Sequence, residues 1–379
     1  MLLLVLQLVL CVAGATVNTT GHQAFIGTVE NSSLVIVSHN RQVLVDGVNF
    51  HDVVRELDDV RTELGETRRA LSELEGTCGL VLEGLRFDGI YAMGGDGAPS
   101  ARVATNEHYF LGSAQRLRGW RGRTSMPAPR YGPAVICSGI NVWVFGGYNN
   151  AFLTRVDLYD ASSNTWTTGL PAMPTARHMP LSALVDGWVY VVGGRAATHD
   201  RYSLADARWE SGLAQIPVHP TRENSAAVSH NGSIFVFGGQ VDNGPYLDSV
   251  FQYFPPPLDS WRQRSSMLQP QSCWGAVVSL NGKEYILVTA GAASNGNRIG
   301  QLDQYDPSTD EWTNLGRMRT VRAGAGVLGV GSHLYVVGGT TTPSSFTNVV
   351  ERYDLSTKLW ELLPSMPTAR VDLGVCLIA

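Results

Sequence analysis

Residues 334–339 read LYVVGG, an apolar run with one aromatic residue that ends in a pair of glycines. The same pattern recurs as IYAMGG ending at Gly95, VWVFGG at Gly147, VYVVGG at Gly194 and IFVFGG at Gly239. A degenerate copy, YILVTAG, ends at Gly291 and has alanine in place of the first glycine. The copies lie roughly 50 residues apart, and a fixed period of this length indicates a repeat architecture built from one supersecondary unit.

Each copy is followed by a polar loop, then by a tyrosine and a tryptophan. The pairs are Tyr109 with Trp120, Tyr159 with Trp166, Tyr202 with Trp209, Tyr253 with Trp261, Tyr305 with Trp312, and Tyr353 with Trp360. Turns such as Asp186-Gly187 join most copies to a preceding apolar run, and such turns are strong hairpin signals. We predict four strands in each repeat. Because one such sheet cannot bury both faces, we expect the sheets to stack radially, with these tyrosines and tryptophans packed between neighbours.

The ordered glycine pair, tyrosine and tryptophan resemble the repeats of the kelch family, and the resemblance runs from about Phe87 to Ala379. It implies an all-β fold, a six-bladed β-propeller over residues 87–379. The last arginine-led run, residues 370–379, follows the final tryptophan, so we expect it to form the innermost strand of blade one and close the ring. Residues 79–89 are the alternative, because their Asp88-Gly89 turn matches the other repeats.

The N-terminal part predicts export and a stem. Residues 1–15 form an apolar run ending in Ala13-Gly14-Ala15, which is typical of a cleaved signal peptide and predicts a secreted, extracellular protein. An uncleaved anchor is the alternative. Residues 16–49 read as a short β-rich segment, and residues 50–76 carry a heptad pattern that predicts a coiled-coil helix and a parallel homo-oligomer. One amphipathic helix lying on the propeller explains the pattern equally well.

The predicted secretion makes the N-glycosylation triplets and the cysteines relevant to the interpretation. Asn18, Asn31 and Asn231 each begin an N-x-S/T triplet and become candidate glycosylation sites. Four cysteines remain after the signal segment, too few for a disulfide framework in a domain this large. We expect Cys137 and Cys376, which sit in apolar strand-like runs, to be free buried residues. Cys78, next to the stem, is a candidate for an interchain disulfide.

Composition and motifs give no sign of catalysis. The formal net charge is −5 without a basic block, which argues against nucleic acid as a partner. No further membrane span follows the signal segment. The histidines occupy unrelated repeat positions and no metal-binding spacing or nucleophile turn occurs, so we expect no catalytic residues, no metal and no cofactor. The alternative is a carbohydrate-active enzyme on a propeller similar to galactose oxidase.

One polar residue recurs at a fixed repeat position, the arginine that begins each innermost strand. These arginines are Arg130, Arg177, Arg222, Arg322 and Arg370, with Gln271 in the place of the sixth. Ring closure gathers them near one mouth of the central channel. The resemblance implies that they contact a ligand, since matching arginines in some kelch proteins bind acidic peptide segments. The alternative is that they pair with acids and carbonyls inside the ring. The sequence therefore predicts a noncatalytic module that binds a protein, such as an acidic segment, or a glycan.

Overall fold

The computed structural model describes residues 26–29, 32–37, 42–45, 48–49, 88–97, 101–111, 119–241, 244–293 and 296–378. The chain divides into two compact units, Met1–Gly84 and Leu85–Ala379. The first unit contains a four-stranded antiparallel sheet in the order β1 (Ile26–Val29), β2 (Ser32–Val37), β3 (Gln42–Val45) and β4 (Val48–Asn49). The signal segment 1–15, the coiled coil predicted over 50–76, Cys78, Asn18 and Asn31 lie outside the described residues.

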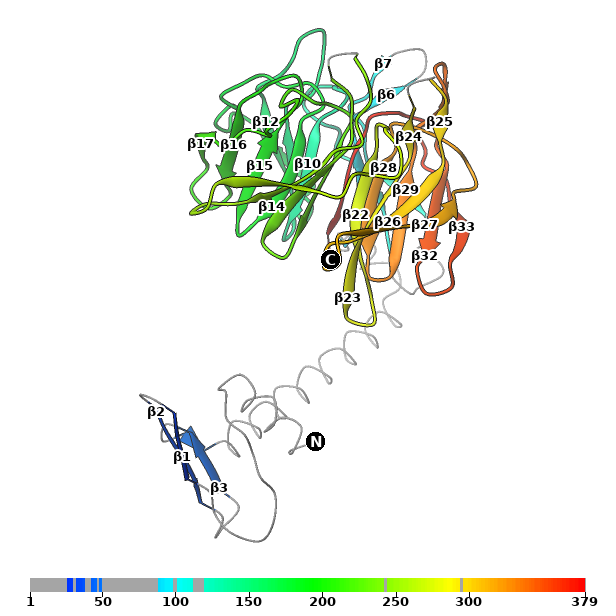
Figure 1. The fold of residues 1–379 in the computed structure, drawn as a ribbon. Helices are drawn as coiled ribbons and strands as arrows, with labels where there is room; N and C mark the ends of the chain where they lie inside the picture. The colour runs from blue at the N-terminus through cyan, green and yellow to red at the C-terminus, as the bar shows by residue number, and fades with distance from the viewer. Residues whose placement is uncertain are drawn as a thin grey trace, which may run out of the picture. The chain divides into compact units, whose positions relative to one another are not determined.

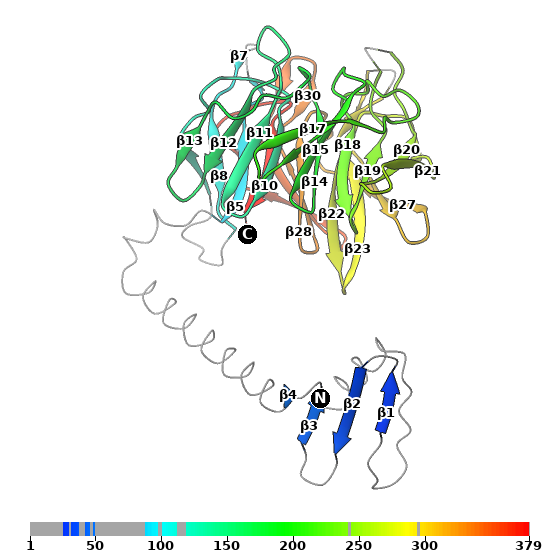
Figure 2. The same cartoon turned by 90° about the vertical axis from the view of Figure 1, so that its left-hand side faces the viewer.

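The second unit is a β-propeller of six four-stranded antiparallel sheets, as the sequence predicts (Figures 1 and 2). Blade one contains β34 (Gly374–Ile378), β5 (Gly89–Met93), β8 (Asn106–Tyr109) and β9 (Trp120–Arg123). Blade two contains β10 (Ala134–Ser138), β11 (Asn141–Phe145), β12 (Val156–Asp160) and β13 (Thr165–Thr167). Blade three contains β14 (Leu181–Val185), β15 (Trp188–Val192), β16 (His199–Ser203) and β17 (Arg208–Leu213).

The other three blades repeat this order from the channel outward. Blade four contains β18 (Ala226–His230), β19 (Ser233–Phe237), β20 (Val250–Phe254) and β21 (Ser260–Arg264). Blade five contains β22 (Trp274–Leu280), β23 (Lys283–Thr289), β26 (Gln301–Asp306) and β27 (Glu311–Arg317). Blade six contains β28 (Gly326–Val330), β29 (His333–Val337), β32 (Val350–Asp354) and β33 (Leu359–Leu363).

Three short hairpins extend the loops that follow the glycine pairs of blades one, five and six. They are β6 (Asp96–Gly97) with β7 (Ala101–Arg102), β24 (Gly291–Ala292) with β25 (Arg298–Ile299), and β30 (Thr340–Thr342) with β31 (Ser345–Phe346). In Figure 1 the first two of these hairpins lie at the upper end of the propeller. The innermost strands start at this end, which we call the mouth face.

The C-terminal strand closes the ring, so the sequence prediction for residues 370–379 is confirmed. β34 pairs antiparallel with β5, from Gly374 opposite Met93 to Ile378 opposite Gly89. The innermost strands then contact one another in a closed cycle of β34, β10, β14, β18, β22 and β28. Because β34 occupies the innermost place in blade one, the alternative assignment of residues 79–89 to that place is wrong.

The hydrophobic core is divided into six clusters, each of which lies between two neighbouring blades. The cluster between blades two and three, for example, contains Phe145 and Tyr202. Five of the six repeat tryptophans also donate their indole N–H to a carbonyl of the preceding blade, as Trp166 does to Thr124 at 2.8 Å. No blade has a core of its own, so the burial of apolar surface requires the whole ring.

Cys137 and Cys376 form a disulfide, so the prediction that they are free buried residues is wrong. Cys137 lies on β10 and Cys376 on β34, and their Cα atoms are 5.6 Å apart, within the range that a disulfide requires. Nothing in the sequence shows this proximity, because the two residues are 239 positions apart and meet only once the ring has closed. The bond covalently joins blade one to blade two.

We expect Cys137→Ala with Cys376→Ala to lower the free energy of unfolding by about 2–4 kcal/mol, because the disulfide constrains a very long loop in the unfolded chain. Chemical denaturation of the double variant and of the oxidised wild type measures the difference. Reduced wild type is the matched control and should behave like the variant. Equal stability of the oxidised and reduced wild type would contradict the prediction.

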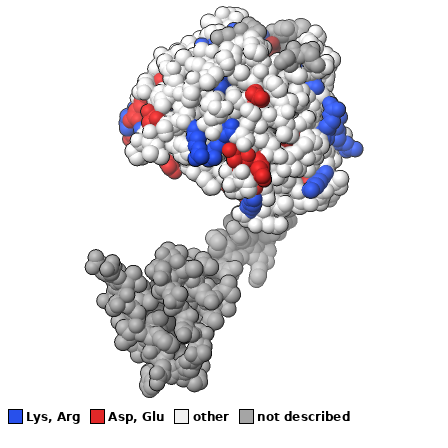
Figure 3. All heavy atoms as spheres, in the orientation of Figure 1, with Lys and Arg blue, Asp and Glu red and all other residues white. Residues whose placement is uncertain are grey.

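Charged side chains on the face shown in Figure 3 form small groups of both signs, separated by uncharged surface. The view shows no broad basic area of the kind that binds a phosphate backbone. Among the residues that the structure describes, no helix is long and apolar enough to cross a membrane.

Candidate functional site

The five recurring arginines lie inside the blades, and each has a relative exposure of 0%. In each of them the guanidinium group donates to a carbonyl near the end of the second strand of its own blade. Nη1 of Arg177 donates to the Gly193 carbonyl at 2.6 Å, and Nη1 of Arg370 donates to the Gly94 carbonyl at 3.1 Å. The side chain therefore ties the start of the innermost strand to the glycine pair of the same blade.

The main chain of the same residues joins neighbouring blades. At five of the six blade junctions, the second glycine of the preceding blade donates its N–H to the carbonyl of this residue, as Gly147 does to Arg177 at 3.1 Å. The bond recurs at Arg130, Arg222, Gln271 and Arg370. The glycine pair permits this approach because both residues adopt positive φ and a Cβ on Gly193 would lie 2.5 Å from the Arg222 carbonyl oxygen.

Most of these guanidinium groups also have a buried acidic partner on the third strand. Nη2 of Arg177 lies 2.6 Å from Oδ2 of Asp200, and Nη2 of Arg370 lies 2.6 Å from Oε1 of Glu107. Arg130 pairs with Asp157 and Arg322 with Glu351. Burial lowers the pKa of Arg177, while the hydrogen bond and the charge of Asp200 oppose that shift. Each pair is thus a buried charge compensated within its own blade.

Blades four and five depart from this pairing in complementary ways. In blade four the acid is replaced by Phe251, whose ring centroid lies 5.4 Å from the guanidinium carbon of Arg222. Burial lowers the pKa of Arg222 to about 10. In blade five the arginine is replaced by Gln271, and Asp303 accepts instead from Gln301 and Asn314, while burial raises its pKa.

These contacts match the alternative in which the arginines hold the ring together. A direct contact between any of them and a ligand would require the blades to rearrange, because none has accessible surface. The sequence carried a signal for this role. An acidic residue stands two positions before the repeat tyrosine in every blade except the fourth, namely Glu107, Asp157, Asp200, Asp303 and Glu351.

We expect Arg177→Met to lower the free energy of unfolding by about 3–5 kcal/mol, because it leaves Asp200 buried without its cation. Adding Asp200→Leu should recover part of the loss, which a double-mutant cycle in denaturant measures. Arg262→Met, at an exposed position of β21, should change stability by less than about 0.5 kcal/mol. A single variant as stable as wild type would contradict the structural role.

The residues two positions after these arginines line the channel in an unusual backbone conformation. Blades two and six have glycine there, Gly132 at φ 59° and Gly324 at φ 62°. Met179, Asn224 and Asp372 hold the same place in blades three, four and one, at φ 49°, 54° and 52°. The left-handed region is unfavourable for residues other than glycine, and methionine adopts it rarely. In blade five, Cys273 does not adopt it, and Trp274 lines the channel instead.

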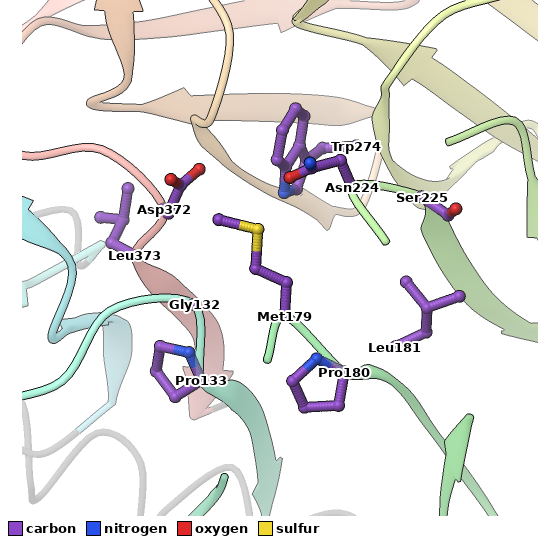
Figure 4. Close-up of a pocket in the computed structure, with 10 residues that line it drawn as sticks. All are labelled: Gly132, Pro133, Met179, Pro180, Leu181, Asn224, Ser225, Trp274, Asp372 and Leu373. Carbon is purple, nitrogen blue, oxygen red and sulfur yellow. The ribbon is translucent and has the colours of Figure 1, made fainter. Parts of the chain in front are cut away.

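Gly132, Met179, Asn224, Trp274 and Asp372 are among the residues that line a pocket of about 70 Å³. Figure 4 shows the carboxylate of Asp372, the indole of Trp274 and the side chain of Met179 around it, with Pro133 and Pro180 on one side. Main-chain bonds hold the lining in place: Gly132 donates its N–H to the Asp372 carbonyl, and Asp372 donates its own to the Gly324 carbonyl, both at 2.8 Å. Five blades contribute to this pocket.

The pocket disfavours the ionised form of the Asp372 carboxyl group. Burial raises its pKa to about 7, the nearby charges of Asp96 and Glu223 act in the same direction, and Arg298 opposes them. Among the described residues Asp372 has no side-chain hydrogen bond or ion pair. Its ionised form therefore lacks the compensation that the acids inside the blades receive.

We expect Asp372→Asn to stabilise the protein at pH 8 and to have little effect at pH 4. A folded-state pKa above the unfolded value means that ionisation disfavours the folded state, and the penalty grows as the pH rises from about 4 to about 7. The gain at pH 8 should be about 2 kcal/mol, roughly half of the full shift because the pocket is open to water. Urea denaturation across this range measures it. Destabilisation at every pH would contradict the prediction.

An aromatic cluster lies on the mouth face, beside the pocket. It contains Tyr131, Tyr148, Phe152 and His178, which we call the aromatic rim. The rings of Phe152 and His178 stack with centroids 5.6 Å apart, and Tyr131 meets His178 edge-on at 5.1 Å. Phe152 is 40% exposed, and both tyrosines are partly exposed. These residues come from blades two and three, so the rim bridges two blades.

Charged groups flank the aromatic rim on both sides. The guanidinium carbon of Arg102, from blade one, lies 4.4 Å from the ring centroid of Tyr131, and its Nη1 lies 3.0 Å from Oδ2 of Asp96. On the other side Glu223 accepts from Arg195 at 2.7 Å and contacts Nδ1 of His178 at 3.0 Å. Burial opposes ionisation of Glu223, but these hydrogen bonds lower its pKa to about 2.

Other candidate groups lie elsewhere. Across the described ranges no group of three or more histidine, cysteine, aspartate or glutamate residues is arranged to hold a metal. His108 and His199 are buried and bonded to backbone carbonyls, and burial lowers the pKa of each to about 4. Asn231 is exposed on the turn between β18 and β19, at the end of the blade opposite the mouth face.

The chain shows similarity to known proteins that contain kelch repeats. Residues 199–378 match the KLHDC2/KLHL20/DRC7 Kelch-repeats domain, and residues 129–169 match the Kelch motif. Kelch-like protein 25 of Xenopus tropicalis is 26% identical over 57% of this chain and 38% of its own length. Kelch repeat protein M-T8 of Myxoma virus (strain Lausanne) is 27% identical over 56% of this chain and 41% of its own. The matches thus span about two fifths of these relatives.

A solved structure, that of YjhT, shares the fold. It superimposes with a TM-score of 0.58 and covers 73% of this chain and 97% of its own, at 14% sequence identity. The chain is thus similar in sequence to kelch-repeat proteins over residues 129–169 and 199–378, and its fold is a six-bladed β-propeller.

Proposed function

We propose that the chain is a noncatalytic extracellular recognition module that binds a protein partner on the mouth face. The observation that carries this proposal is the aromatic rim, in which Phe152 is exposed and two tyrosines are partly exposed beside Arg102 and Arg195. Tyrosine and arginine are enriched among the residues that dominate binding energy at protein interfaces. A kelch propeller is consistent with such a module.

The construction of the mouth face suits recognition. Its side chains come from loops after the glycine pairs and from the starts of innermost strands, which the ring of buried arginines holds in place. Loops on a rigid scaffold can vary in sequence without loss of the fold. The rim and its flanking charges span four neighbouring blades, so a partner that covers them contacts the ring as a unit.

Three features support the extracellular part of the proposal. The apolar segment 1–15 resembles a signal peptide. The disulfide between Cys137 and Cys376 is of a kind that persists in oxidising compartments. Asn231, the one sequon asparagine among the described residues, is exposed far from the rim, so a glycan there would leave the mouth face open. Oligomerisation through residues 50–76 is a further part of the proposal.

The enzyme alternative receives less support. The histidines that a catalytic site could use, His108 and His199, are buried with backbone partners, and His178 is part of the rim through Glu223. Glycan binding fits the same face, because aromatic rings also stack on sugars. The fully buried arginines give no basis for binding an acidic segment, so we favour a partner that contacts the rim itself.

We expect Phe152→Ser with Tyr148→Ser to abolish capture of cell-surface proteins by the full-length chain. The protein is expressed with a C-terminal tag in mammalian cells, recovered from the medium and crosslinked to intact cells before mass spectrometry. The rim variant should lose the proteins enriched by wild type by at least tenfold, because it removes the exposed aromatic surface.

Leu359→Ser is the matched control, because Leu359 is 67% exposed on the outermost strand of blade six. It should capture the same proteins as wild type. Equal capture by the rim variant contradicts a binding role for the mouth face. Retention of the protein inside the cell contradicts the extracellular part, and binding to a glycan array with no captured protein contradicts the choice of partner.

A further inference from the structure

The pocket that Asp372 lines, which we call the channel pocket, differs from the aromatic rim in that its acidic residue has no ion-pair partner among the residues that the structure describes. Beside the aromatic rim, Asp96 forms an ion pair with Arg102, and Glu223 forms ion pairs with Arg195 and His178. Inside the blades, most acids are paired with the ring arginines. Asp372 alone among the residues lining the pocket carries a carboxylate, and within the described part of the chain it has no cation or donor in contact.

The backbone at Asp372 and at its equivalents in blades three and four is in the left-handed region, which is unfavourable for methionine and which asparagine and aspartate adopt more readily. Glycine holds the equivalent place in blades two and six, so the fold itself requires no side chain there. Met179, Asn224 and Asp372 each adopt the left-handed conformation with a side chain directed at the channel pocket. Strain of this kind clusters at binding and active sites, where the side chain is needed for something other than stability.

The remaining walls of the pocket are apolar. Pro133, Pro180, Leu181 and Leu373 are apolar residues of this lining, and the indole of Trp274 lies on the upper side of the pocket in Figure 4. A pocket lined by one carboxylate, one indole and apolar side chains suits an organic cation, because the carboxylate neutralises the charge, an indole attracts cations, and the apolar walls accept methylene groups. A neutral apolar group would leave the carboxylate without a partner.

We propose that the channel pocket binds the positively charged side chain of a lysine or arginine presented by a protein partner, with Asp372 as its counter-ion. The proposal rests on the proposed function, since it identifies which group of a partner on the mouth face enters the channel. A volume of about 70 Å³ holds a few water molecules, which fits one charged head group and not a folded segment. Insertion displaces this water and supplies the missing cation.

The other charges around the pocket do not replace such a ligand. Asp96 and Glu223 add negative potential at Asp372, and Arg298 opposes it without forming an ion pair with it. Arg102, Arg195 and His178 face the acids of the rim. We therefore expect binding of a cation to strengthen as the pH rises from 6 to 8, because Asp372 ionises over this range.

The test uses the full chain and three single-residue probes, Nα-acetyl-lysine methylamide, Nα-acetyl-arginine methylamide and the uncharged Nα-acetyl-norleucine methylamide. Saturation-transfer NMR of the probes at pH 6 and pH 8 gives their affinities. Wild type should bind at least one cationic probe at least tenfold more tightly than the norleucine probe. Asp372→Asn should reduce this preference at least tenfold, since asparagine keeps the shape and tolerates the left-handed backbone.

Glu311→Gln is the matched control, because Glu311 is an exposed acid on β27, away from the mouth face, and it should bind the probes like wild type. Thermal unfolding checks that both variants are folded. Three results would each overturn the inference: equal binding of the norleucine probe, no binding of either cationic probe, or undiminished binding by Asp372→Asn.

The outcome is separable from that of the capture experiment. If the rim variant loses its captured proteins while Asp372→Asn binds the cationic probes like wild type, the cation site is wrong and the proposed function stands. If the probes bind as expected while the rim variant captures the same proteins as wild type, the cation site stands as a feature of the channel and the proposed role of the rim is wrong.

Discussion

The propeller depends on one residue position, that of the arginine before each innermost strand, because its side chain and its main chain each form a separate contact. Its guanidinium group binds its own blade, and its carbonyl accepts an N–H from the glycine pair of the preceding blade. Each core cluster lies between two blades, so these hydrogen bonds join the same neighbours whose apolar faces pack together. The glycine pair and the arginine therefore constrain each other, and blade five changes both at once, with Ala290 at the first glycine and Gln271 at the arginine.

A ring held in this way leaves the positions after the arginine free to vary. Their backbone is fixed by bonds such as that from Gly132 to the Asp372 carbonyl, so a change of side chain there alters the channel without altering the blades. Part of the rim and part of the pocket thus occupy consecutive positions of the repeat: Tyr131 and His178 of the rim, like the flanking Glu223, stand one residue after the arginine, and Met179, Asn224 and Asp372 two. The residues of the proposed binding face and those that hold the ring are thus adjacent in the sequence, which allows their roles to be separated by mutation.

The sequence predicted the blade number, the four strands of each repeat and the closing strand, because glycine pairs, aromatic residues and hairpin turns are local signals that recur. It could not predict the disulfide, since only the closed ring brings Cys137 to Cys376. The arginines were recognised as a set, but their burial is compensated by acids such as Asp200, which stand on the third strand of the same blade. The sequence could not show that the carboxylate of Asp372 lacks an ion-pair partner within the described chain, because its environment is assembled from five blades.

The pairing of β34 with β5 also constrains the order of folding during synthesis. β5 is the first propeller strand to leave the ribosome and β34 the last, so blade one stays without its innermost strand while the other five are already complete. Its exposed edge and the open side of blade six, where apolar residues such as Leu328 await their neighbours, are then available to wrong partners. A chaperone that holds this edge until β34 arrives would protect the protein at the step where it is most vulnerable.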